Sequence, residues 1–125
     1  MAISADDIST LEHVLNEKFS KERLRFKMSV HFVRDRMNHE RNTPPITITE
    51  LQGIFNRLTT IHISKLLKLK HNESFNVRCL TTDINIPCVM SKSVSSGGAQ
   101  SSEVIAITVM RKKDFKAKDA IEFKV

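Results

Sequence analysis

The stretch SFNVRCLTTDINIPCVMSKSV, residues 74–94, marks a change in the sequence from helical to β-type patterns. It holds two β-rich segments, at 74–80 and 84–94, and EVIAITVMRK at 103–112 is a third. Branched and apolar residues of this kind are typical of strands. The polar segment SSGGAQSS, residues 95–102, joins the last two strands, which predicts an antiparallel hairpin.

Helical patterns fill most of the chain before this change. A first helix is expected to begin at Asp7 or Ser9, either of which can act as an N-cap. A later helix is expected to begin at Thr47, which with Glu50 has the S/T-x-x-E spacing of a capping box. Apolar residues recur at helical spacing in both segments: Ile8, Leu11, Val14, Leu15 and Phe19 in the first, and Leu51, Ile54, Phe55 and Leu58 in the second. LTTIHISKLLKLK, residues 58–70, can extend the later helix after a break at Thr59 and Thr60.

A strand and a further helix are expected between these two segments. LRFKM, residues 24–28, alternates apolar and basic residues, which predicts a short strand with its apolar side chains on one face. Ser29 then lies where an N-cap is expected, followed by a helix from Val30 to about His39. NTPPI, residues 42–46, ends this helix because two consecutive prolines cannot continue it.

The order of these elements predicts the fold class. Most of the helices precede most of the strands, which is typical of an α+β domain with N-terminal helices packed on a small antiparallel sheet. We expect residues 24–28 to join the three C-terminal strands in that sheet. A chain of 125 residues can bury a real hydrophobic core, so residues 1–125 are expected to form a single domain.

Basic charge is concentrated in one part of the chain. The protein carries a formal net charge of +6. Residues 1–17 contain four acidic residues and no lysine or arginine, whereas residues 18–41 contain eight basic and three acidic residues. A concentration of this kind favours an anionic partner, and nucleic acid is the commonest one.

Cysteine spacing and hydropathy exclude other classes. Cys79 and Cys88 form no CxxC pair and have no second cluster beside them, so we expect buried free thiols and no zinc site. We expect no cofactor either. The first residues lack the basic and apolar regions of a signal peptide, and no apolar run approaches membrane-spanning length. These features predict a protein of a reducing cytoplasm that does not bind membranes.

SVHFVRDRMNHER, residues 29–41, is the candidate site. Helical spacing puts Arg34 and Asp35 on the same face as His31, and puts Arg36 well round the helix. His31 lies in the first turn, where free N–H groups favour an anion. A histidine and an arginine there can bind a phosphodiester or act on one. The alternative is that the charged residues are solvated and His31 is a half-buried, hydrogen-bonded residue, and spacing alone favours that interpretation.

Other polar residues have competing interpretations. His39 and Arg41 suit the end of a helix at least as well as a catalytic site. His62, between Ile61 and Ile63, is more typical of a packed histidine than of a ligand. Arg111 ends a predicted strand, from which its side chain can project into a site. The residues predicted to contact nucleic acid are Arg23, Arg25, Lys27, Arg41, Lys112 and Lys113, the last two from a solvated run that adds phosphate affinity.

Two segments carry a resemblance to a known family. RFKMSVHFVRDRMNHER at 25–41, followed by ELQGIF at 50–55, resembles the core of the RegB endoribonuclease family of T-even phages. That family has a strand, a serine, a histidine, an Asp-Arg pair and a helix with a Glu-Leu-Phe-like segment. Through it the chain resembles the RelE-like ribonuclease toxins, in which helices pack on a small antiparallel sheet. DINIP at 83–87 and TVMRKKDFK at 108–116 also look like a family of small T-even-like phage proteins without a known activity.

The resemblance implies an activity and a setting. The activity is metal-independent RNA cleavage, in which the ribose 2′-OH attacks its own phosphodiester and leaves a 2′,3′-cyclic phosphate. His31 would be the base or acid, Arg36 or Arg34 would stabilise the phosphorane, and Arg111 would add a third cation. The implied partner is RNA, including mRNA on ribosomes, in the cytoplasm of a host bacterial cell.

The chain departs from the family pattern at two positions. The family places its arginine four residues after the histidine, where this chain has Asp35. The family also has a second functional histidine directly after the phenylalanine of the later helix. Here Phe55 is followed by Asn56, and the nearest histidine is His62, which makes His62 the candidate for that second group.

Two other classes of function compete with catalysis. One is a nucleic-acid-binding regulator in which residues 47–70 form a helix-turn-helix, with Thr59 and Thr60 in place of the expected glycine turn. The other is a phage accessory protein that binds a host protein or packs in the virion.

Overall fold

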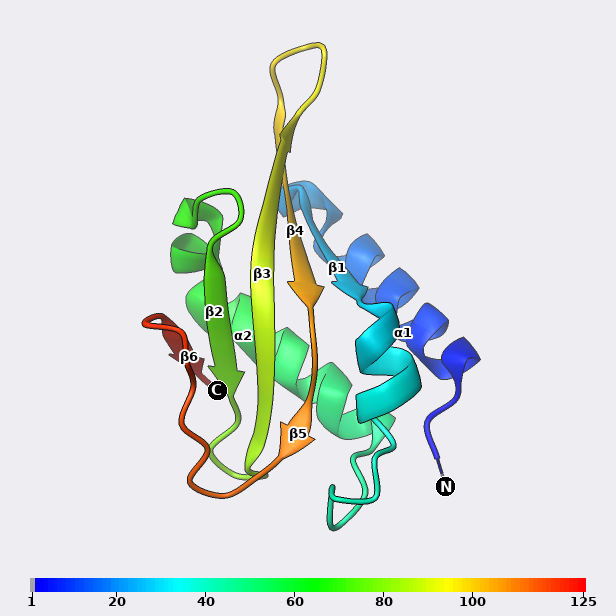
Figure 1. Ribbon diagram of the computed structural model, residues 1–125. Coiled ribbons are helices and arrows are strands. Elements are labelled where there is room, and N and C mark those ends of the chain that lie inside the picture. Colours follow the sequence, from blue (N-terminus) through cyan, green and yellow to red (C-terminus); the bar gives the residue numbers. More distant parts are fainter. Residues whose placement is uncertain (1) are drawn as a thin grey trace.

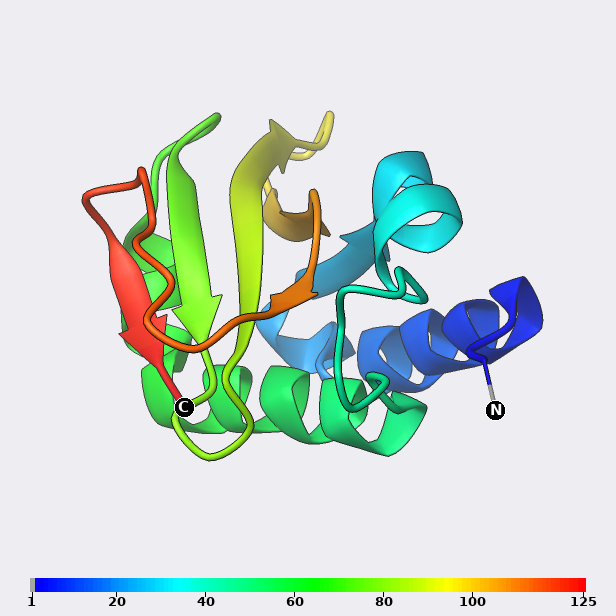
Figure 2. The same cartoon turned by 60° about the horizontal axis from the view of Figure 1, so that its bottom comes forward.

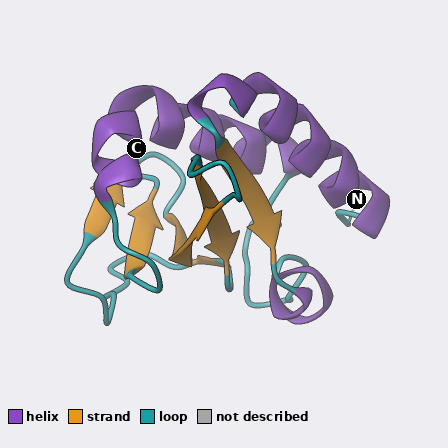
Figure 3. Cartoon of the chain, turned by 90° about the horizontal axis from the view of Figure 1, so that it is seen from above, coloured by secondary structure: helices purple, strands orange, loops and turns teal. Residues whose placement is uncertain are grey.

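Two long helices cover one face of a β-sheet and leave its other face open. The computed structural model describes residues 2–125. Helices α1, Ala5–Lys18, and α2, Ile48–Lys68, lie side by side behind the sheet (Figure 1). A short helix, η2, Phe32–Arg36, lies on the opposite side of the sheet from α1 and α2 (Figures 2 and 3). The expectation of an α+β fold is therefore confirmed.

The sheet is mixed, and not antiparallel as the sequence predicted. Over residues 2–125 it has six strands in the order β1-β4-β3-β2-β6, with β5 beside one end of β3. The strands are β1 Leu24–Met28, β2 Ser74–Arg78, β3 Ile84–Val94, β4 Gln100–Ala106, β5 Met110–Arg111 and β6 Glu122–Lys124. The β3–β4 hairpin is antiparallel, but β1 pairs with β4 and β6 pairs with β2 in parallel. Long connections through other elements precede both parallel pairings, and such connections permit either strand direction.

The predicted strand 103–112 is divided in two. β4 ends at Ala106 and β5 begins at Met110. Pro87 of β3 lies opposite the break, and its carbonyl accepts a hydrogen bond of 2.9 Å from the N–H of Ile107. Because proline has no N–H to return, the ladder is interrupted at this position.

Both long helices begin with capping boxes. The cap of α1 is Ser4, and not Asp7 or Ser9: its hydroxyl accepts from the N–H of Asp7 at 3.0 Å, and the Asp7 carboxylate accepts from the N–H of Ser4. The predicted box of Thr47 and Glu50 at the start of α2 is confirmed. The expected break at Thr59 and Thr60 is absent from α2, whose backbone leaves helical geometry at His62 instead.

The core lies between the helices and the sheet. All the predicted α2 stripe is buried, as are Ile8, Leu11 and Leu15 of α1. Phe26 of β1 packs at ring-centroid distances of 5.2 Å from Phe55 and 6.1 Å from Phe19. Cys79 and Cys88 are buried free thiols, as expected.

Side chains of α1 close the outer edge of β1. The carboxamide oxygen of Asn16 accepts from the N–H of Phe26 at 2.7 Å, and Glu12 accepts from the N–H of Met28 at 2.8 Å. The Asn16 amide also donates to the Phe26 carbonyl at 3.5 Å, as a neighbouring strand would. Unpaired edge strands are templates for association, so this pairing protects β1.

Replacement of Asn16 by alanine should weaken the fold and open this edge. We expect a loss of about 1–3 kcal/mol in the free energy of unfolding, because the N–H of Phe26 loses its partner. Urea unfolding measures this loss, and sedimentation at increasing concentration measures self-association. Asn56→Ala is the matched control, because Asn56 accepts from exposed Lys18 and caps no strand. Equal behaviour of the two variants would contradict the protective role of Asn16.

Candidate functional site

The candidate site begins where β1 ends. Ser29 accepts from the N–H of Phe32 at 3.0 Å through its hydroxyl, which confirms the predicted cap. The same hydroxyl donates to the carbonyl of Ile107 at 2.7 Å, beyond the end of β4. The helix start is thereby fixed to two strands of the sheet, and His31 lies in the first turn as expected.

The helix that follows is short and wide, and not an α-helix from Val30 to His39 as predicted. Its Phe32–Arg36 segment is a π-helix, and the N–H of Met37 donates to the carbonyl of Phe32 at 2.9 Å, five residues back. Phe32 and Met37 are both buried. An α-helical turn would place Arg36, and not Met37, above Phe32, so the wider turn lets the apolar residue face the core.

The π-helix joins three side chains in one hydrogen-bonded group. The Nε–H of Arg36 donates to Nε2 of His31 at 2.9 Å, and Nδ1 of His31 lies 3.2 Å from Oδ2 of Asp35. An arginine can only donate, so Nε2 accepts and the imidazole proton is on Nδ1, directed at Asp35. The two contacts fix the orientation of the His31 ring from both sides. We call Asp35, His31 and Arg36 the His31 group.

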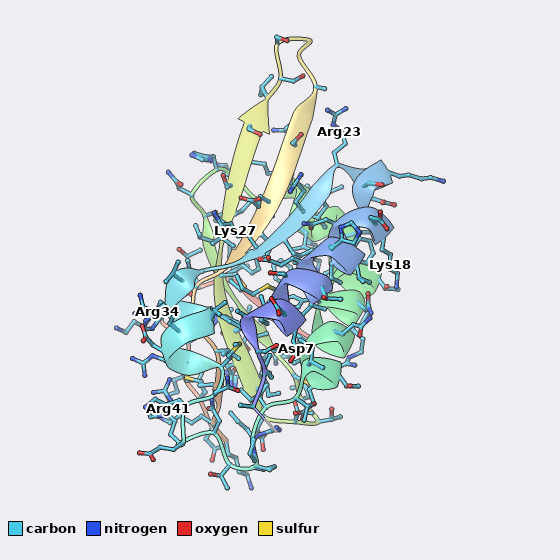
Figure 4. The ribbon with its side chains drawn as sticks, turned by 90° about the vertical axis from the view of Figure 1, so that its right-hand side faces the viewer. Asp7, Lys18, Arg23, Lys27, Arg34 and Arg41 are labelled. Atoms are coloured by element: carbon cyan, nitrogen blue, oxygen red, sulfur yellow. The ribbon has the colours of Figure 1, made fainter. Side chains whose placement is uncertain are left out.

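This geometry corrects the predicted partner of His31. Helical spacing put Arg34 beside His31 and Arg36 round the helix, but the wider turn reverses the two. Arg34 is exposed and projects from η2 toward the side of the open sheet face (Figure 4). The predicted contact between His31 and Asp35 is present. Since the side chains of His31 and Asp35 are 44% and 62% exposed, a ligand in solvent can reach the group.

Basic side chains line the edge of the molecule from which η2 projects. Figure 4 shows Arg23 at the start of β1, Lys27 near its end, and Arg34 and Arg41 below them, whereas Lys18 projects on the helix side. We call the exposed residues Arg23, Arg25, Lys27, Arg34 and Arg41 the basic edge. Arg25 lies 4.0 Å from Glu103, and this long contact between an exposed and a half-buried side chain contributes little to stability.

Arg111 is a structural residue in this fold, and not a free cation at the site. Its side chain is 10% exposed, and it donates to both carboxylate oxygens of Glu50. The carbonyls of Pro44, Pro45 and Thr82 accept from its remaining donors. A guanidinium has five N–H groups, so none remains for a phosphate. The expectation that Arg111 adds a third catalytic cation is therefore corrected.

His62 lies at the opposite edge of the sheet from His31. Its Nε2 is 2.9 Å from the carbonyl of Lys124, and its ring packs on Phe123 at a centroid distance of 5.1 Å. Both partners belong to β6, whereas His31 follows β1 at the other end of the strand order. The two predicted catalytic histidines therefore cannot act on one phosphodiester, and His62 is packed as its sequence context indicated.

Position 56 is also remote from the His31 group. Asn56 lies in α2 and accepts from Lys18 of α1 at 3.1 Å. A histidine at this position would lie in the helix layer, on the other side of the sheet from η2. The structure does not bring together the two positions at which the RegB-like pattern places its histidines.

Asn42 is a positioning residue that the sequence did not reveal. It is 3% exposed, its amide donates to the carbonyl of Arg36 at 2.9 Å, and its oxygen accepts from the N–H of Arg111 at 2.9 Å. It thereby fixes the end of η2 to β5. The sequence Asn-Thr-Pro-Pro at 42–45 predicts a turn, and nothing local indicates the distant partners of Asn42.

The described residues, 2–125, contain no group of three or more histidine, cysteine, aspartate or glutamate side chains that could hold a metal ion. Across the same residues, no helix combines the length and apolar composition that crossing a membrane requires. No protein-family model, curated protein or solved structure matches the chain.

Proposed function

We propose that the protein binds RNA along its basic edge and cleaves the strand at the His31 group. The observation that carries this proposal is the π-helix, which puts a carboxylate, an imidazole and a guanidinium into one exposed hydrogen-bonded group. Helices of this rare type occur frequently at functional sites. The RegB resemblance of residues 25–41 covers the same segment and supports the same chemistry.

Each member of the group has a role in transesterification. Nε2 of His31 takes the proton from the ribose 2′-OH, and the 2′-oxygen forms a bond to the adjacent phosphorus. Asp35 holds the imidazole in the required tautomer and stabilises the imidazolium that forms. The guanidinium of Arg36 stabilises the charge of the phosphorane. The P–O5′ bond breaks, solvent supplies a proton to the leaving oxygen, and the products carry a 2′,3′-cyclic phosphate and a 5′-hydroxyl.

The contact between Arg36 and His31 makes the base available only when substrate is bound. Without a phosphate, Arg36 donates to the Nε2 lone pair that must accept the proton. A phosphate is a stronger acceptor because it is charged, so it draws Arg36 from His31 and frees Nε2. Substrate binding and activation of the base are then one event.

A second candidate is RNA binding without cleavage. Two observations favour it. The contact with Arg36 occupies the Nε2 lone pair that the base must use, and position 56, where the RegB-like pattern has a second histidine, is remote from His31. The helix-turn-helix form of this alternative is not favoured, because the two helical segments of residues 48–68 meet at a single kinked residue, His62, with no turn between them. Any regulator of this kind would bind through the basic edge.

Product termini separate the two candidates. Single-stranded RNAs and ribosome-bound mRNA are incubated with the protein in the presence of EDTA, and the termini of any products are identified by mass spectrometry. We expect 2′,3′-cyclic phosphate and 5′-hydroxyl ends. RNA that is bound but uncut would favour the second candidate, and 3′-hydroxyl products would contradict the mechanism.

A further inference from the structure

A small basic pocket lies between the loop after η2 and strand β5. It has a volume of about 300 Å³ and is lined by Arg41, Met110, Arg111 and Lys112. The first residue belongs to the loop after η2, and the others belong to β5 and the residue that follows it. The fold therefore joins two segments of the predicted nucleic-acid surface that are 70 residues apart in the sequence.

The charge of this pocket comes from Arg41 and Lys112. Arg111 is neutralised by Glu50, and its N–H groups are all occupied. Arg41 and Lys112 are exposed, and across residues 2–125 neither forms an ion pair. The backbone N–H of Lys112 donates to the carbonyl of Asp83, which fixes the start of the lysine without using its ammonium group. Two solvated cations thus face a preformed hollow.

Asn42 fixes this pocket relative to the His31 group. It follows Arg41 in the chain, and its buried side chain bridges the carbonyl of Arg36 and the N–H of Arg111. Arg36 of the His31 group and Arg111 of the pocket wall therefore both contact Asn42. Arg34 and Arg41 project on the same side of the molecule, so one extended ligand can reach both places (Figure 4).

We propose that this pocket binds a second phosphate of the RNA strand, beside the phosphate held at the His31 group. The inference rests on the proposed function for the identity of the strand. A volume at the low end of the range for ligand pockets, about 300–1,000 Å³, suits a phosphate with its ribose. Arg41 and Lys112 neutralise the phosphate, and Met110 offers an apolar wall for the sugar. Contact at two fixed phosphates sets the register of the strand at His31.

The test compares two double variants of equal charge. Arg41→Gln with Lys112→Gln alters the pocket, and Lys65→Gln with Lys68→Gln alters exposed lysines of α2 on the other side of the sheet. The probe is a fluorescent all-2′-O-methyl oligonucleotide, which lacks the attacking hydroxyl and cannot be cleaved by this route. Its anisotropy gives the affinity at a series of salt concentrations. Thermal unfolding verifies that both variants are folded.

We expect the pocket variant to bind more weakly and the slope of its salt dependence to become shallower by about 0.7, as the loss of one contact to a single-stranded phosphate requires. The α2 variant should match the wild type. In NMR spectra, inorganic phosphate should shift the backbone amides of residues 41 and 112 in the wild type and not in the pocket variant. This separates binding of phosphate itself from binding of other parts of the oligonucleotide.

The outcomes distinguish this proposal from the proposed cleavage. Equal affinities and equal salt slopes of the two double variants would overturn the pocket, whether or not the wild type cuts RNA. Weaker binding by the pocket variant together with uncut RNA would support the pocket and reject cleavage. A wild type that does not bind the oligonucleotide at low salt would overturn both.

Discussion

Replacement of Arg111 by leucine should lower the free energy of unfolding by about 3–5 kcal/mol, the cost of removing one partner from a buried ion pair. Arg111 holds Glu50 through two hydrogen bonds of 2.7 and 3.1 Å, and donates to three backbone carbonyls. In the variant, the Glu50 carboxylate and the three carbonyls lose the N–H groups that Arg111 donates to them. Loss of this residue should therefore loosen β5, the proline loop and the start of α2 together.

Chemical unfolding with urea measures the effect. Arg34→Leu is the matched control, because the same exchange on an exposed arginine of η2 should change stability by no more than about 0.5 kcal/mol. Glu50→Gln added to Arg111→Leu should cost less than the sum of the single changes, because the two side chains act as one pair. Equal stabilities of the Arg111 and Arg34 variants would contradict the structural role of Arg111.

The pH dependence of stability gives a second readout of the pair. Burial raises the pKa of Glu50, but hydrogen bonds from Arg111 and Thr47 lower it by more than burial raises it. The pKa of Glu50 therefore lies below its ordinary value. The folded-state pKa is then lower than the unfolded one. The stability that the ionised Glu50 contributes to the fold is present above the pKa of the unfolded state and is lost as pH falls through the pKa of the folded state. The difference in stability between the wild type and Arg111→Leu should therefore become smaller in acid.

Local features of the fold could be predicted from the sequence, and pairings between distant segments could not. The caps at Ser29 and Thr47 depend on side chains and N–H groups three residues apart, so the pattern contains all the information. The alternation in residues 24–28 gives the buried face of β1. It is the same whether the neighbouring strand is parallel or antiparallel, so it could not indicate the parallel pairing with β4.

Strand β6 is a second element that local sequence could not predict. Its three residues contain one buried side chain, Phe123, which is too little for a strand pattern. The strand is held by its pairing with β2 and by contacts of Glu122 with Arg78 and Asn76. Those partners are more than 40 residues away, and a segment rich in lysine gave no sign of them.

The sequence predicted the contact of His31 with Asp35 but assigned the wrong arginine to His31. The prediction assumed that residues three or four apart share a face, which holds for an α-helix. Phe32 and Met37 are five apart, and their burial together requires the wider turn. Apolar residues at that spacing, with charged residues between them, were the signal that could have indicated Arg36. Arg111 gave no such signal, because its partner Glu50 is 61 residues away.

His31→Ala should reduce RNA cleavage by about 10²–10⁴, the usual cost of losing a general acid–base group. The side chain is 44% exposed and packs in no core, so the thermal midpoint should fall by less than about 3 °C. His13→Ala is the matched control, because His13 is an exposed histidine of α1 with a carboxylate four residues later. Single-turnover cleavage rates and thermal unfolding of the three proteins provide the comparison.

Variants of the two neighbours test how the group works. Asp35→Asn should slow cleavage because the Nδ1 proton loses its charged acceptor, while RNA affinity is kept. Arg36→Ala removes the charge opposite the phosphorane and should cost about 10²–10³ in rate, although it frees Nε2 of His31. If phosphate draws Arg36 away from His31, it should shift the ¹⁵N resonance of Nε2 in the wild type and leave that resonance unchanged in Arg36→Ala. Wild-type cleavage rates in His31→Ala would remove the histidine from the mechanism, and a large fall in its thermal midpoint would assign it to the fold instead.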